Sequence, residues 1–206
     1  MNQTYEKDVY KYPDNEIRSI AKEIEGITEK EMYKKNLELS NLNRKLEELS
    51  IKDDLTGLYN RRKIDQELEK CLYIWERYNR PFSIIIIDID DFKKINDTYG
   101  HLIGDMVLEK ISKIIRENIR KSDIASRWGG EEFLILLPET NLQNATLVAE
   151  AFRRKIEEAN FGIDEKITVS VGVANIENNE SIDSLIQRAD KNLYKAKESG
   201  KNKVVF

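Results

Sequence analysis

The chain has 206 residues, with 34 lysines and arginines against 38 aspartates and glutamates and a formal net charge of −4. This length allows one globular domain with an appendage or two very small domains. Hydrophobic residues at 40 % provide one sizeable core, and charged residues at 35 % favour long solvated helices over a sandwich or barrel. The acidic balance argues against a nucleic-acid backbone as the main partner, because phosphate binding needs a basic face.

The expected compartment follows from three features. The single cysteine, Cys71, excludes an internal disulfide. The N-terminus lacks the apolar core of a signal peptide, and the longest apolar stretches, 82–87 and 133–137, are too short to span a bilayer. We therefore expect a cytoplasmic protein.

The first 50 residues predict a polar, loose tail over 1–14 and then a dimerising coiled-coil helix up to residue 50. Apolar residues there follow an a/d heptad spacing in two blocks. The blocks are Ile17, Ile20, Ile24, Ile27 and Leu39, Leu42, Leu46, Leu49. Ile17 and Leu39 are 22 residues apart, one more than three heptads, which predicts a stutter near 26–35. An amphipathic helix packed on its own domain is the alternative, but the narrow stripe favours a partner helix.

Residues 51–206 predict a second domain in which helices and strands alternate. Helices are expected over 60–78, 102–118, 142–158 and 181–200, and strands over 82–90, 124–128, 131–137, 167–174 and 203–206. Cys71 falls on the buried face of the first helix. The core order, β-α-α-β-β-α-β followed by a helix and a strand, predicts an α+β fold. We expect a ferredoxin-like or palm-type antiparallel sheet with flanking helices, largely on one face.

Carboxylates at the end of the apolar strand predict a metal site. Asp88 and Asp90 share a face of the strand, and paired hard oxygens suit Mg²⁺ when water and phosphate complete its shell. A turn aspartate, or a helix cap at Asp91, is the simpler interpretation of each residue alone. A hairpin joined by Gly129-Gly130 would bring Glu131 to Asp88 if it pairs beside the first strand. A like-charge cluster of that kind requires a cation.

Four segments together resemble the GGDEF family of diguanylate cyclases, in the family's order. They are 53–62 (DDLTGLYNRR), 88–105 (DIDDFKKINDTYGHLIGD), 129–133 (GGEEF) and 189–200 (ADKNLYKAKESG). The resemblance covers about residues 51–206 and no single motif carries it. It implies a palm-like fold and condensation of two GTP molecules into cyclic di-GMP and two pyrophosphates, in a two-fold dimer with two Mg²⁺ or Mn²⁺ ions per site.

The resemblance also implies the roles of individual residues. The metal ligands would be Asp88, the Ile89 carbonyl and Glu131; the catalytic residues Glu131, Lys93 and Glu132; and the substrate-binding residues Phe92, Asn96, His101, Asp105, Lys197 and Lys201. Lys197 would hold the terminal phosphates, while Asn96 and Asp105 would read guanine. A carboxylate matches the guanine N1–H and N2–H₂ donors, and adenine would leave it unpaired, which gives discrimination of about 10⁴.

Two further features concern regulation and a departure from the family. Arg120 and Asp123 match the family's Arg-x-x-Asp product-inhibition motif, although a surface ion pair is the simpler interpretation of that spacing. The family usually has Arg where this chain has Lys201, which keeps the charge but loses the bidentate fork.

Two other classes of function compete with an active cyclase. A degenerate domain would bind GTP or cyclic di-GMP and signal through its helix as a receptor. The presence of Asp88, Glu131, Lys93, Asn96 and Asp105 disfavours degeneracy. A coiled-coil interaction module would leave the ordered motifs unexplained. The signal that controls the protein is not readable from the sequence.

Overall fold

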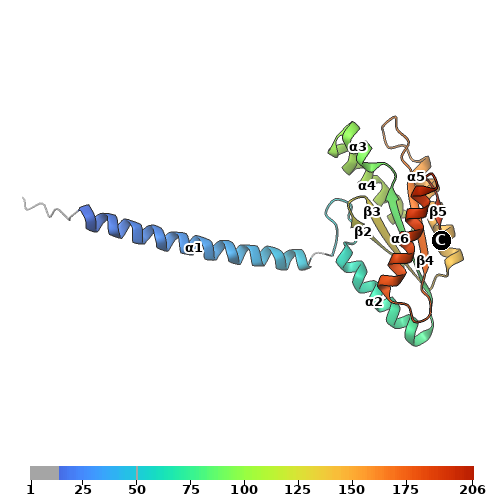
Figure 1. Cartoon of the computed structure of the whole chain (residues 1–206), viewed down its shortest axis with the longest axis horizontal. Coiled ribbons are helices and arrows are strands. Elements are labelled where there is room, and N and C mark those ends of the chain that lie inside the picture. The colour runs from blue at the N-terminus through green and yellow to red at the C-terminus, as the bar shows by residue number, and fades with distance from the viewer. Residues whose placement is uncertain (1–13, 50) are drawn as a thin grey trace, which may run out of the picture. The chain divides into compact units, whose positions relative to one another are not determined.

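The computed structural model of the protein describes residues 14–49 and 51–206. The chain divides into two compact units between residues 50 and 51. The first contains one helix of 36 residues, α1 (Asp14–Leu49), which follows Pro13 and is interrupted by no further proline (Figure 1). The tail expected over 1–14 lies outside the described residues, except Asp14, which begins α1. No helix within the described ranges is long and apolar enough to cross a membrane.

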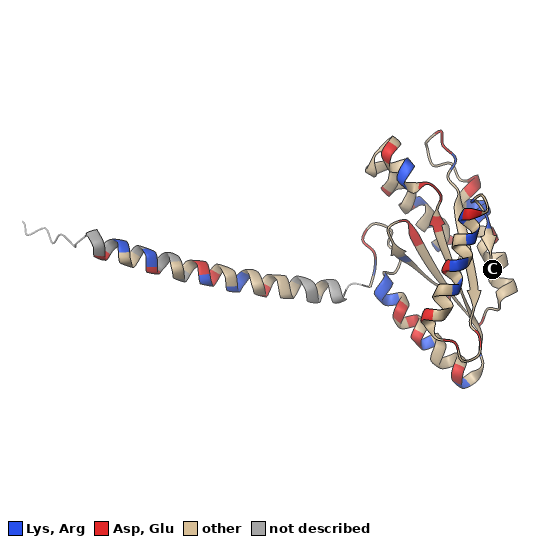
Figure 2. Cartoon of the chain, viewed as in Figure 1, with Lys and Arg blue, Asp and Glu red and all other residues tan. Residues whose placement is uncertain are grey.

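The described leucines of the predicted seam are solvent-exposed along α1. Leu39, Leu42 and Leu46 are 55–57 % exposed, and Ile20 is similar. The side chains of Ile17, Ile24, Ile27 and Leu49 lie outside the described part of the structure. Lysine, arginine, aspartate and glutamate are interspersed along the helix (Figure 2). The helix is confirmed, while its pairing as a coiled coil stays a prediction.

The second unit is built on a five-stranded sheet with the order β2-β3-β1-β4-β5. The strands are β1 (Phe82–Ile89), β2 (Ile124–Gly129), β3 (Glu132–Pro138), β4 (Val169–Asn175) and β5 (Val204–Val205). β1 is central and pairs antiparallel with both β3 and β4. β5 pairs parallel with β4, so the sheet is mixed, because α6 carries the chain back between these two strands. The predicted element order is confirmed from β1 onward.

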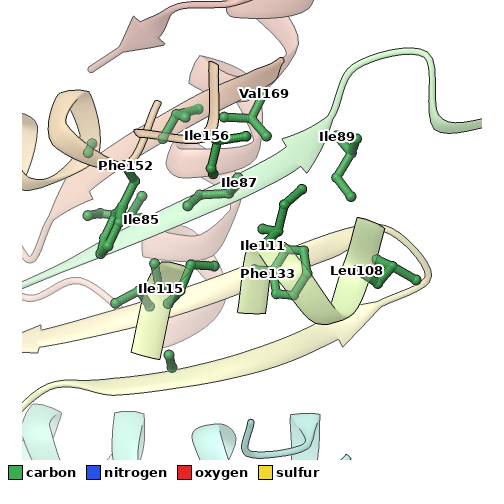
Figure 3. Close-up of a cluster of buried hydrophobic side chains, with 14 of the residues drawn as sticks. Ile85, Ile87, Ile89, Leu108, Ile111, Ile115, Phe133, Phe152, Ile156 and Val169 are labelled. Atoms are coloured by element: carbon green, nitrogen blue, oxygen red, sulfur yellow. The ribbon is translucent and has the colours of Figure 1, made fainter. Parts of the chain in front are cut away.

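Helices cover both faces of the sheet, so the expectation that they lie largely on one face is wrong. They are α2 (Arg61–Tyr78), α3 (Phe92–Tyr99), α4 (His101–Glu117), α5 (Leu142–Glu158) and α6 (Ile182–Glu198). One cluster joins Ile85, Ile87 and Ile89 of β1 to α4 and α5 (Figure 3), and a second joins Ile84 and Ile86 to α2 and α6. The reason is the unbroken apolar run of β1, which is buried on both sides.

Cys71 and Gly172 show how closely two of the helices pack on the sheet. Cys71 of α2 is buried as predicted, and burial raises the pKa of its thiol to about 11. Gly172 lets α6 lie directly on β4, because a Cβ at this position would be 2.1 Å from the carbonyl oxygen of Ala189. This close approach positions α6, which carries Lys197 in its last turn, over the sheet.

Candidate active site

The site is built around Asp88, at the C-terminal end of β1. Its side chain belongs to the face covered by α6, and the Lys197 Nζ atom lies 2.7 Å from Asp88 Oδ2. The aspartate is 4 % exposed. Burial raises the pKa of Asp88, the Lys197 ammonium opposes this shift, and the charges of Glu131 and Asp90 add to it. Asp88 is therefore a buried carboxylate that is stabilised by a neighbouring cation.

The β2–β3 hairpin brings two glutamates to this carboxylate. Asp88 pairs with Glu132 in the register of β1 and β3, as expected if the hairpin lies beside the first strand. Burial raises the pKa of Glu132, and the charges of Asp88 and Asp190 raise it further. Glu132 rather than Glu131 is therefore the residue directly opposite Asp88, and Glu131, next to it in the turn, is close enough for its charge to act on Asp88.

The turn of the hairpin differs from the prediction by one residue. Gly129 pairs with Glu132, so Gly130 and Glu131 form the turn rather than Gly129 and Gly130. The register of β2 and β3 shifts between Arg127 and Gly129, because β2 contains one extra residue there, as in a β-bulge. Glu131 consequently lies at the tip of the hairpin and not at the start of the next strand.

The residues at the end of β1 fit a hard divalent cation. Asp88, Glu131 and the carbonyl of Ile89 offer oxygen ligands, and the Glu131 charge acts on Asp88. Within the described ranges, no group of three histidine, cysteine, aspartate or glutamate side chains has the arrangement of a metal site. Two carboxylates and a carbonyl suit Mg²⁺, because this ion keeps several waters and phosphate oxygens in its shell.

Asp90 lies on the same face of the sheet as Asp88, as its spacing predicted, but its carboxylate oxygens are occupied by hydrogen-bond donors. Its carboxylate accepts hydrogen bonds from Thr168 Oγ1 and Ser170 Oγ, at 2.7 Å each, and from the amide of Asn202 at 3.0 Å. Ser170 is also the partner of Asp88 in the register of β1 and β4, so Asp90 stays on the face of the sheet that its spacing predicted. Asp90 is a structural anchor between β4 and the C-terminal turn.

The helix pair α3–α4 carries the residues expected to bind the nucleoside. Asn96 of α3 lies against Gly104 of α4, where a Cβ would be 2.0 Å from Asn96 Oδ1. Phe92 is buried beside the same glycine, whereas Asp105 and His101 are exposed. Asp105 follows Gly104 in α4 and is exposed to solvent. Gly104 is a site residue that the sequence reasoning missed; its only signal was a glycine within a helical pattern.

Two further lysines lie at the border of the site. Lys93 is exposed on the first turn of α3. Lys201 Nζ lies 2.6 Å from Asp91 Oδ1. Asp91 occupies the N-cap position of α3 with a φ of 57° and makes no side-chain capping bond, so the simple cap interpretation is wrong. Its carboxylate binds the lysine instead.

The Arg120–Asp123 segment forms a tight turn before β2. The amide of Arg120 donates to Asp123 Oδ2 at 2.9 Å, and Ser122 Oγ donates to Asp123 Oδ1. The surface ion pair offered as the simpler interpretation does not occur: the carboxylate is held by the backbone of Arg120. The guanidinium of the exposed Arg120 is left for another contact.

A contact that sequence reasoning missed links residue 53 to the hairpin. Arg127 Nη1 lies 3.4 Å from Asp53 Oδ2, while Arg127 Nε donates to the carbonyl of Gly130 at 2.9 Å. Asp53 also accepts from the amide and hydroxyl of Thr56. Arg127 therefore bridges the start of the second unit and the turn that carries Glu131.

Comparison with known proteins agrees with this arrangement. Residues 50–203 match the family described as "Diguanylate cyclase, GGDEF domain". Diguanylate cyclase DgcM of Escherichia coli K12 is 41 % identical over 168 residues, covering 82 % of this chain and 41 % of that protein. The chain thus spans about two fifths of the length of this curated relative.

Two solved structures are similar to the chain. The coiled coil and GGDEF domain of DgcB from Caulobacter crescentus, in complex with c-di-GMP, is 29 % identical with a TM-score of 0.72, covering 86 % of this chain and 98 % of that chain. The active GGEEF domain of a diguanylate cyclase from Vibrio cholerae is 36 % identical with a TM-score of 0.68, covering 71 % and 95 %. The resemblance read from the four motifs is confirmed: the chain belongs to the GGDEF domain family of diguanylate cyclases.

Proposed function

We propose that the protein is a diguanylate cyclase, which condenses two GTP molecules into cyclic di-GMP and two pyrophosphates. The observation that carries this proposal is the cluster of Asp88, Glu131 and Lys197 at the end of β1, which combines metal-type oxygens with a cation for phosphate. The signature 129–133 reads GGEEF, as in the Vibrio cholerae domain described as active. Phosphoryl transfer asks mainly for positioning and charge neutralisation, which such a cluster provides.

Asp88, the Ile89 carbonyl and Glu131 would hold Mg²⁺ or Mn²⁺, two ions per site. When bound, these ions neutralise phosphate charge and favour the ionised form of the attacking 3′-hydroxyl. Glu131, at the hairpin tip, would accept the proton of that hydroxyl, with Glu132 as its acidic neighbour. Arg127 holds the turn that orients Glu131 through the Gly130 carbonyl.

The remaining residues would each bind a different part of the nucleotide. Lys197 and Lys201 would bind the terminal phosphates, and Lys93 would offset charge on the phosphates in the transition state. Asn96 and Asp105 would read guanine. Phe92 and His101 flank this pair on α3 and α4. Lys201 forms one point contact where the family's arginine would form two, so we expect weaker triphosphate binding with the same chemistry.

The reaction requires two domains, since each would bind one GTP. A two-fold homodimer through residues 1–50 would bring the two sites together. Leu39, Leu42 and Leu46 of α1 are each more than half exposed to solvent. A parallel partner helix would cover their side chains. DgcB, a similar protein, is described as having a coiled coil. We assign residues 1–50 to dimerisation and 51–206 to catalysis, in the cytoplasm where GTP is available.

Arg120 and Asp123 would form a product-inhibition site. The guanidinium of Arg120 suits guanine O6 and N7, and the turn holds it near the start of β2. Cyclic di-GMP added to the assay should slow the wild type, and Arg120→Ala should relieve this while synthesis continues. Lys121→Ala, the exposed neighbour, is the control. Equal product sensitivity of wild type and Arg120→Ala would place inhibition elsewhere.

The direct test is turnover of GTP with Mg²⁺ or Mn²⁺, followed by chromatography of the product. We expect cyclic di-GMP from the wild type and at least a hundredfold loss in Glu131→Gln, which removes a charged ligand without changing volume. Binding of Mn²⁺ in the presence of GTP should weaken in parallel. Glu109→Gln, on the exposed face of α4, should behave as wild type. A wild type that binds GTP without turnover would instead favour the receptor function.

A further inference from the structure

Three successive residues after α6 have left-handed backbone conformations. They are Gly200, Lys201 and Asn202, with φ values of 106°, 59° and 47°. Such a conformation is natural for glycine but costs other residues about 1 kcal/mol or more. This C-terminal turn (residues 200–202) is therefore maintained by contacts elsewhere in the structure.

Asn202 supplies those contacts through its backbone amide and both polar atoms of its side chain. Its amide donates to Asp90 Oδ2 at 3.0 Å, its Nδ2 donates to Glu157 Oε1 at 3.0 Å, and its Oδ1 accepts from Arg153 Nη1 at 2.8 Å. Glu157 and Arg153 belong to α5 and are themselves paired at 2.7 Å. The side chain of Asn202 thus ties the C-terminal turn to α5, while its backbone amide ties the turn to Asp90, the residue that follows β1.

Asp90 completes this arrangement as a buried acceptor. It is 7 % exposed, and Thr168 and Ser170 donate to it in addition to Asn202. Because its neighbours Ile89 and Asp91 lie at the end of β1 and the start of α3, the C-terminal turn is held directly against the segment that forms the site.

Two lysines lie within or next to the C-terminal turn. Lys201 lies within it and reaches Asp91, and its amide donates to the Ala196 carbonyl at 3.0 Å, which closes the end of α6. Lys197 is on the last turn of α6 and reaches Asp88. Lys201 is therefore directed at the β1 end by the turn that Asn202 ties to α5, and the same turn closes the last turn of α6, which carries Lys197.

We propose that Asn202 is a positioning residue that sets the affinity for the terminal phosphates of the nucleotide. It touches neither substrate nor metal in this scheme and acts through Lys197 and Lys201. This inference rests on the proposed function, since it assumes that those lysines meet the β- and γ-phosphates. It predicts that Asn202 affects the binding of GTP more than the binding of GMP, which lacks these phosphates.

Asn202→Gly is the principal variant, because glycine keeps the left-handed backbone and removes only the side-chain bonds to Arg153 and Glu157. We expect the KM for GTP and its Kd, measured with Ca²⁺ to suppress turnover, to rise about tenfold, with kcat changed less than twofold. The affinity for GMP should stay the same. Asn118→Gly is the matched control, since it also removes two side-chain bonds, to Ile114 and Lys155, at the other end of α4.

A second experiment moves the negative charge of residue 157 to residue 202. Asn202→Asp places a carboxylate against Glu157 and should weaken GTP binding further, while Glu157→Gln added to it provides an amide donor and should restore most of the affinity. Equal losses for GTP and GMP, no loss for GTP, or a wild type that binds both nucleotides equally would overturn the proposal. If the wild type makes no cyclic di-GMP yet Asn202→Gly selectively loses GTP affinity, only the proposed reaction fails.

Discussion

Asp88 and Asp90 are two residues apart but have opposite surroundings. Asp88 faces a lysine ammonium and the charges of other carboxylates, and burial raises its pKa. Asp90 accepts from two hydroxyls and a backbone amide, all neutral donors that satisfy its oxygens. A carboxylate that is fully bonded to neutral groups anchors the backbone, whereas one in a like-charge cluster attracts a cation. The division of roles follows from these partners.

Gly104 gives a prediction at this scale. Gly104→Ala would place a Cβ 2.0 Å from Asn96 Oδ1, so the amide expected to read guanine must move. We expect the KM for GTP to rise about tenfold. The melting temperature should change little, because the preference of a helix for alanine over glycine, about 1 kcal/mol, offsets the cost of moving Asn96.

Gly26→Ala is the control for this substitution, since its Cβ meets no atom within 4 Å on the helix α1. Its KM should equal that of the wild type. A Gly104→Ala protein that keeps its KM would show that the position of Asn96 is not critical for nucleotide binding.

Local sequence patterns indicated candidate residues for the site but not the long-range contacts that hold them. Asp88, Glu131 and Lys197 follow from ordered motifs, and they lie together. Gly104 and Asn202 were missed because their importance comes from neighbours 8 and 45 residues away, which no local pattern reports. Asp90 lies on the predicted face, but the donors that occupy its carboxylate are 78, 80 and 112 residues away, so no local pattern could show that it is a structural anchor.

Among the elements, the segment after residue 50 is joined to the catalytic hairpin by Asp53 and Arg127. Burial opposes ionisation of Asp53, but hydrogen bonds from Thr56 and the charge of Arg127 outweigh it, so the pKa of Asp53 is lowered. A depressed carboxylate pKa contributes stability above the unfolded-state value, and this contribution is lost as the pH falls through the folded-state value.

Asp53→Asn should therefore lower the free energy of unfolding by about 1–2 kcal/mol at neutral pH. The difference from wild type should be constant above about pH 5 and shrink below about pH 4. Urea titrations across this range measure it. The exposed neighbour gives the control Asp54→Asn, which should change stability by less than about 0.5 kcal/mol at any pH. A pH-independent difference would mean that the Asp53 charge contributes nothing.

The elements themselves were largely predictable, and their arrangement less so. Periodicity located most helices and strands to within a few residues, but it predicted no residue range for the eight-residue helix α3 (Phe92–Tyr99). The run of four isoleucines in β1 already indicated a sheet covered on both faces. The comparison with a ferredoxin-like fold led instead to the expectation of helices on one face. The parallel β5 and the bulge before Glu131 depend on long-range pairing that local pattern does not encode.

For the whole molecule, removal of residues 1–50 tests the proposed dimer. A free domain must find its partner by diffusion, whereas a paired helix keeps the local concentration near the millimolar range. The specific activity of the shortened chain should collapse at roughly micromolar protein, and the rate should rise with about the square of its concentration. The measurement is initial rate against protein concentration.

The intact chain is the control, and its specific activity should not depend on concentration over the same range. A shortened chain with the same specific activity as the intact chain at every concentration would remove α1 from the mechanism. Circular dichroism of the shortened chain separates a lost dimer from a lost fold.

The two edge strands of the sheet limit the aggregation of such a dimer. Identical sheets held at high local concentration tend to join through exposed edge strands. Here β5 has only two residues, and the outer edge of β2 is partly occupied by a parallel bridge from Tyr59 to Ser126. Neither edge therefore offers a long, flat template for strand addition. Two copies of the domain can meet repeatedly face to face, as two-substrate chemistry requires, without polymerising into a fibre.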